Sequence, residues 1–176
     1  IYTSRKTFIS PALGVLYGVP ALRGWKAIEF PPEAHRAGIL TQPSFLALNS
    51  QGTRSSATLR GKALRELILC QKVPAPPANV DFSAVENPDP TLRTARERID
   101  FHLKNPVCAG CHKIMDPIGL GFENFDGAGR YRETENNAHI DSSGKIDNAS
   151  YADIEGLGQV LHDTPALPTC LVRRAF

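Results

Sequence analysis

Proline and glycine interrupt this sequence so often that only short secondary-structure elements fit between them. The chain has 14 residues of each type among 176. Proline removes a backbone donor and clashes inside a helix, and glycine weakens both helices and strands. We therefore expect a mainly α, loop-rich fold, in place of a regular bundle or a doubly wound sheet.

Apolar periodicity predicts where these short helices lie. The clearest one is expected over residues 58–73, where Leu59, Leu64 and Ile68 belong to one apolar stripe and Thr58 can cap the N-terminus. Further helices are expected in residues 10–19, 41–50, 87–103, 151–163 and 164–176, and a small β-hairpin within residues 130–146.

Composition and charge limit the function classes. The net charge is +2 and the charges are mixed along the chain, which does not favour nucleic-acid binding. No apolar run reaches the roughly 20 residues of a transmembrane helix. We expect residues 1–57 to be the tail of a larger preceding domain and residues 58–176 to form one domain. The first residue is not Met and no signal-peptide pattern follows it, so we expect a fragment or a processed form.

Residues 108–112 read Cys-Ala-Gly-Cys-His, the pattern for covalent attachment of a c-type haem. Two thiols must reach the two vinyl groups of one porphyrin, and two intervening residues on a helical turn place both sulfurs on one edge. The next residue, His112, then provides the proximal iron ligand. The expected fold is thus short helices around one haem, as in cytochrome c.

Cys108 and Cys111 have two alternative roles. A zinc site would need two more ligands, which Cys70 and Cys170 could supply, but no second Cys-x-x-Cys knuckle is present. A thioredoxin-like redox pair would follow a hydrophobic strand, whereas this pair follows a charged segment. If the haem takes Cys108 and Cys111, the other two cysteines remain as an even pair. We expect a disulfide between them, because haem c is attached outside the cytoplasm, where disulfides persist.

Three stretches also carry a family resemblance: residues 36–80, residues 102–136 and the segment "IDSSGKID". They resemble a family of large secreted proteins of planctomycetes and myxobacteria. These proteins are cytochrome-like and mostly of unknown function. The sharpest element is "CAGCHKIMDPIGLGFENFDGAGRYR", and the resemblance runs from about His35 to Phe176. Members are usually several times longer, which implies that this chain is the C-terminal part of such a protein.

The sixth iron ligand is expected to be His102, six residues before Cys108. The turn at residues 105–106 can fold it over the haem, and the family pattern also places a histidine there. Met115 is the less favoured candidate, because it lies only three residues after His112 and has to reach the opposite face of the ring. An open sixth site is the third alternative.

Other residues are expected around the haem. Arg130 or Arg132 can pair with a propionate, although either can equally pair with a nearby carboxylate. Phe122 can form part of the wall, and the carbonyl group near Pro117 can accept the Nδ1–H of His112.

The expected function is electron transfer by a mono-haem c-type cytochrome module. It would act in the periplasm or at the bacterial cell surface, with other redox proteins or as a subunit of a larger complex. The alternatives are a peroxidase-like haem enzyme with an open sixth site, and an interaction module stabilised by zinc or a disulfide, without haem.

Overall fold

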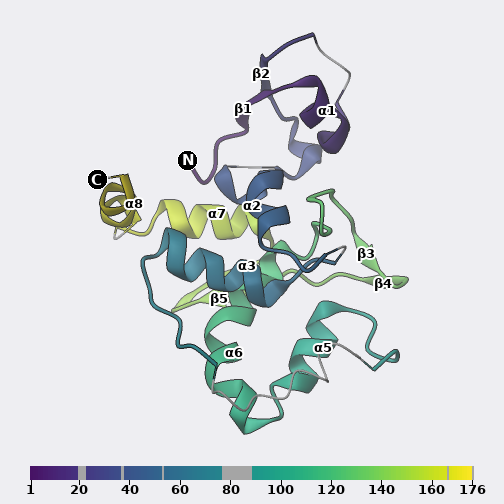
Figure 1. Ribbon diagram of the computed structural model, residues 1–176, viewed down its shortest axis with the longest axis vertical. Helices are drawn as coiled ribbons and strands as arrows, with labels where there is room; N and C mark the ends of the chain where they lie inside the picture. Colours follow the sequence, from purple (N-terminus) through teal and green to yellow (C-terminus); the bar gives the residue numbers. More distant parts are fainter. Residues whose placement is uncertain (20–22, 37, 53, 77–88, 166, 176) are drawn as a thin grey trace.

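The computed structural model describes residues 1–19, 23–36, 38–52, 54–76, 89–165 and 167–175. The chain is about 47 % helical, and its short helices and small antiparallel strand pairs are joined by many loops (Figure 1). This confirms the expectation of a mainly helical, loop-rich fold with a small β-hairpin.

The elements are short throughout. The α-helices are α1 (Pro11–Tyr17), α2 (Pro43–Leu48), α3 (Ala57–Ala63), α5 (Ala95–His102), α6 (Pro106–Gly119), α7 (Ile154–His162) and α8 (Leu167–Ala175). Single helical turns are η1 (Pro32–Ala34), η2 (Ile39–Thr41), the π-helical η3 (Leu64–Ile68) and η4 (Leu120–Phe122). The strands are β1 (Lys6–Ile9), β2 (Lys26–Glu29), β3 (Thr134–Glu135), β4 (Ala138–His139), β5 (Gly144–Ile146) and β6 (Ala149–Tyr151). They form three antiparallel pairs, β1–β2, β3–β4 and β5–β6.

The helix expected over residues 58–73 is present, but its first residue, its N-cap and its end differ from the prediction. It begins at Ala57, and Ser56 rather than Thr58 caps it by accepting a hydrogen bond from the backbone N–H of Leu59 (3.2 Å). It continues as η3 and ends at Ile68. The expected cap was therefore wrong by two residues, and this leaves the Thr58 hydroxyl free for another partner.

The helix expected over residues 87–103 is α5, which starts only at Ala95. Thr94 and Glu97 form a capping box, which satisfies two N-terminal backbone donors at once. Residues 87 and 88 lie outside the described part of the chain. The predicted hairpin is β3–β4, and Asn136 and Asn137 form its turn with left-handed backbone angles (φ 48° and 60°). The antiparallel pair β1–β2, whose strands are separated by α1, and the β5–β6 hairpin were not predicted.

The hydrophobic core joins the two ends of the sequence. Tyr2, Leu40 and Leu46 pack in the same buried cluster as residues from α7 and α8, so residues on both sides of position 57 contribute to this core. The domain boundary expected at residue 57 stays a prediction. The cluster comprises Tyr2, Leu40, Leu46, Leu64, Ile68, Ile118, Phe122, Phe125, Ile146, Tyr151, Ile154, Leu157, Leu161 and Leu167.

Helices α3 and α6 pack against each other (Figure 1). Their backbones approach most closely at two glycines, and this contact positions the candidate site. A Cβ atom on Gly61 would lie 2.0 Å from the Met115 carbonyl oxygen, and one on Gly119 would lie 1.7 Å from the Ala57 carbonyl oxygen. Both distances are far inside van der Waals contact. Only glycine therefore allows the two backbones to approach this closely.

We expect Gly119→Ala to lower the free energy of unfolding by about 3 kcal/mol, because the added methyl group forces the two helix backbones apart. Urea denaturation of the protein measures this. Gly110→Ala is the matched control in the same helix, since a Cβ atom there would meet nothing within 4 Å. Its higher helix propensity is expected to add up to about 1 kcal/mol. Equal effects of the two substitutions would show that the contact between α3 and α6 is not tightly packed.

Candidate functional site

The Cys-x-x-Cys-His motif lies on the first turns of α6. Asn105 caps this helix by accepting a hydrogen bond from the backbone N–H of Val107 (3.0 Å), and Pro106 occupies the first helical position. The three-residue spacing places Cys108 and Cys111 on one side of the helix. Both thiols are free and half-buried.

His112 forms its side-chain hydrogen bond within the same helix. Its Nδ1 atom lies 2.8 Å from Oδ2 of Asp116, one helical turn further on. The second oxygen of this carboxylate accepts a hydrogen bond from the Thr58 hydroxyl on α3 (2.8 Å). Asp116 is 0 % exposed. The partner of His112 is therefore a buried carboxylate, and the expected backbone carbonyl near Pro117 was wrong, because the Pro117 carbonyl accepts from the Tyr151 hydroxyl (2.8 Å).

In the structure, the imidazole ring of His102 lies against the imidazole ring of His112. The centroids of the two imidazole rings are 4.6 Å apart, in an edge-to-face contact with an interplanar angle of 73°. The hydrogen bond to Asp116 raises the pKa of His112. Burial lowers the pKa of His102, and the neighbouring His112 lowers it further. The site therefore favours a neutral His102 beside a more basic His112.

We expect the pair of His112 and Asp116 to make the stability of the haem-free protein depend on pH. The pKa of His112 is raised on folding, so its contribution is fully present below the ordinary histidine value of about 6.5. It is lost as the pH rises through the raised pKa. Urea denaturation at a series of pH values measures the free energy of unfolding.

In that series, His112→Gln is expected to abolish this loss of stability, whereas replacing the exposed His139 by Gln should preserve it. A loss of the same size in the His112→Gln protein would show that other groups cause it.

A cavity of about 140 Å³ opens beside the two histidines. It is formed by α3, α5, α6 and the loop before α3. Its lining residues are Gln51, Arg54, Ser55, Ala57, Thr58, Ala95, Arg98, Ile99, His102, His112 and Asp116. A typical ligand pocket has about 300–1,000 Å³, so this cavity has room for one edge of a large cofactor.

The other expected site residues lie elsewhere. Phe122 is in the core, where its ring packs against Phe45 with centroids 5.5 Å apart. Met115 is buried and does not line the cavity. Arg130 is exposed, and Arg132 pairs with the buried Glu123 (3.2 Å), the carboxylate alternative considered above.

Thr58 and Arg54 line the cavity, and sequence reasoning did not assign either of them to the site. The contact of Asp116 with His112 could have been predicted from the sequence, because a residue four positions after His112 lies on the same helix face. Thr58 had no such signal, since its contact with Asp116 depends on how α3 packs against α6. Arg54 is exposed at the cavity, and its side chain forms no hydrogen bond or ion pair with the part of the chain that the structure describes.

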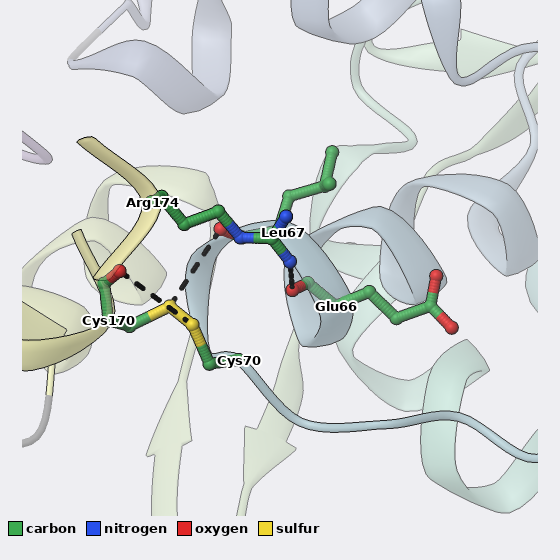
Figure 2. Close-up of a disulfide and its surroundings, with 5 residues drawn as sticks. All are labelled: Glu66, Leu67, Cys70, Cys170 and Arg174. Atoms are coloured by element: carbon green, nitrogen blue, oxygen red, sulfur yellow. Dashed lines mark hydrogen bonds between the residues drawn. A yellow bond between two sulfur atoms is a disulfide. The ribbon is translucent and has the colours of Figure 1, made fainter. Parts of the chain in front are cut away.

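The expected disulfide between Cys70 and Cys170 is present, and it joins the segment after η3 to α8 (Figure 2). Next to it, the Arg174 guanidinium donates a hydrogen bond to the Glu66 carbonyl oxygen. The zinc alternative in its proposed form was wrong, because the disulfide consumes both of the additional thiol ligands. Within the described ranges, no group of three or more His, Cys, Asp or Glu residues is arranged so that it could hold a metal ion.

The residues at the N-terminus of α6 fit a covalently attached haem. Both thiols are free, and His112 uses Nδ1 for Asp116, which leaves Nε2 without a hydrogen-bond partner among the described residues. Two apolar side chains beside the motif, Phe101 (55 % exposed) and Val107 (64 % exposed), offer additional apolar contact. The rings of His102 and His112 touch, so His102 must move away from His112 to bind the opposite face of an iron centre.

Fold and site define a small helical, loop-rich protein with one disulfide and a helix that presents two free thiols and a histidine. The chain belongs to the PSCyt3 family, described as "Protein of unknown function (DUF1588)", whose model matches residues 36–135. Comparisons with curated proteins and with solved structures gave no match. Within the described residues, no helix is both long enough and apolar enough to cross a membrane.

Proposed function

We propose that this chain is a mono-haem c-type cytochrome module that transfers electrons. The observation that carries the proposal is the arrangement on α6, where two free thiols on one helix side are followed by a histidine that borders the cavity. The haem supplies a one-electron couple between ferric and ferrous iron. The chain supplies the two thioether links through Cys108 and Cys111 and the proximal ligand through His112.

His102 is the proposed distal ligand. It lies at the end of α5 in edge-to-face contact with His112, and among the described residues it is the only other histidine that lines the cavity. Leu103, Lys104 and Asn105 connect α5 to α6, and a shift of α5 about this short connection would separate the two rings. Two histidine ligands would give a lower potential than histidine with methionine.

The disulfide supports a location in the periplasm or at the cell surface, because disulfides persist in oxidising compartments. Thioether attachment of haem takes place in the same compartments. There, the module would exchange electrons with other redox proteins or with subunits of a larger complex.

Expression with a haem-attachment system tests the proposal. We expect a covalent haem that survives denaturation, with sharp reduced α and β bands unchanged by carbon monoxide. Cys108→Ala is expected to retain haem through one thioether, and His112→Ala to lose the low-spin spectrum. The Cys70→Ala/Cys170→Ala protein is the matched control, since it removes two cysteines and keeps the motif. Absence of covalent haem in the unsubstituted protein would refute the proposal.

A peroxidase-like enzyme is the second candidate, favoured by one observation. The Asp116 carboxylate on Nδ1 of His112 increases the basicity of a proximal ligand. The same spectra separate the two functions, because an open sixth site gives a high-spin spectrum that changes on adding carbon monoxide.

A further inference from the structure

The buried Asp116 carboxylate is the feature of this site that sequence reasoning left without a role. Among the described residues, its two oxygens form hydrogen bonds with two partners only, the Thr58 hydroxyl and Nδ1 of His112, each at 2.8 Å. No lysine or arginine within the described residues forms an ion pair with it, and His112 is its one ionisable partner there. A buried charge is costly unless it is paired. Because His112 is the ionisable group paired with the Asp116 carboxylate, the electrostatic effect of this carboxylate falls mostly on His112.

The position of Asp116 is fixed by the packing of two helices. Thr58 comes from α3 and Asp116 from α6, and these helices approach closely at Gly61 and Gly119. The hydrogen bond between them thus spans a rigid contact. His112 and Asp116 are one turn apart in the same helix, which fixes the orientation of the imidazole.

We propose that Asp116, held in place by Thr58, is the positioning residue of the haem site: it keeps His112 protonated at Nδ1 with Nε2 free for iron, and it lowers the reduction potential of the haem. This inference rests on the proposed function. A negative charge behind the ligand stabilises ferric iron more than ferrous iron, because the ferric state carries one more positive charge. The Thr58 hydroxyl draws part of that charge away from His112 by donating to the carboxylate.

Substitutions of Asp116 and of its partner Thr58 lead to opposite expectations for the midpoint potential. Asp116→Asn removes the charge, so the potential of the haem-loaded protein is expected to rise. Thr58→Val removes the hydroxyl donor and keeps the side-chain shape, so the carboxylate acts more strongly on His112 and the potential is expected to fall. Thr58→Ser keeps the hydroxyl and should leave the potential unchanged. Spectroelectrochemical titration of the full chain measures all four proteins.

A purely structural role would move Asp116→Asn and Thr58→Val in the same direction, because both substitutions loosen the same helix contact. That result, or an unchanged potential in Asp116→Asn, would overturn the inference.

A second measurement needs no haem. In the full chain expressed without the attachment system, long-range nitrogen-15 NMR spectra at alkaline pH report which nitrogen of His112 carries the proton. We expect the Nδ1–H form, and a mixture of both tautomers in Asp116→Asn. An Nε2–H form in the unsubstituted protein would disprove the role of Asp116. Loss of covalent haem with the expected tautomer would instead refute the proposed function and leave the role of Asp116 in orienting His112 intact.

Discussion

Replacing Arg60 by methionine is expected to lower the free energy of unfolding by about 3–5 kcal/mol. The guanidinium is 0 % exposed, and it donates hydrogen bonds to the carbonyl oxygens of Leu46, Phe122, Phe125 and Asp126 at distances from 2.6 to 3.3 Å. These carbonyls belong to the end of α2 and to the chain around and after η4. Burial lowers the pKa of Arg60 to about 10, so the side chain stays charged at neutral pH.

Methionine fills a similar volume but leaves these buried acceptors unpaired, and each lost partner costs about 1–3 kcal/mol. The free energy of unfolding of such domains is only about 5–15 kcal/mol, so a large fraction of it depends on the Arg60 side chain. Urea denaturation followed by circular dichroism measures the loss.

The control for this prediction is Arg130→Met, because Arg130 is exposed and its side chain forms no hydrogen bond with the described residues. Its effect should stay within about 0.5 kcal/mol. Arg60→Lys is expected to remain strongly destabilising, since an ammonium group has three donors and lacks the planar fork. If Arg60→Met unfolded at the same urea concentration as Arg130→Met, the buried guanidinium would not be a stabilising element.

Removing the disulfide is expected to have an effect of similar size. Cys70 and Cys170 are 100 residues apart in the sequence, and a crosslink that closes such a loop restricts the unfolded chain. The chain-entropy estimate for this loop is about 4–5 kcal/mol. The loop encloses α5, α6 and all the residues of the candidate site after Thr58. We therefore expect the Cys70→Ala/Cys170→Ala protein to unfold at a markedly lower urea concentration.

This comparison is cleanest in a background with Cys108→Ala and Cys111→Ala, where no other thiol can exchange with the disulfide. Dithiothreitol provides the matched control, because it should destabilise that background protein and leave the variant without Cys70 and Cys170 unchanged. Equal stability of the two proteins under oxidising conditions would mean that packing of α8 alone holds the C-terminus.

Local patterns predicted much of the fold. Ser10 accepts from the backbone N–H of Leu13 (3.3 Å) before a proline in the first turn of α1, as such a sequence indicates. The boundaries failed where two capping residues competed, as for Ser56 and Thr58. The β1–β2 pair and the β5–β6 hairpin were missed because strands of three or four residues carry too little alternation to stand out from loops.

The candidate site likewise contains residues that the sequence predicts and contacts that only the structure reveals. The sequence by itself determined what lies on one helix, namely the thiols of Cys108 and Cys111 and the adjacent His112. It also left an even pair of cysteines elsewhere in the chain for a disulfide. Only the tertiary structure decided which partners reach that helix from elsewhere, namely Thr58 on Asp116 and His102 on His112. Residues within one helix have fixed spacings, whereas contacts between helices depend on how closely their backbones approach. Here, two glycines in α3 and α6 set that distance, and nothing in either helix alone reveals that they meet.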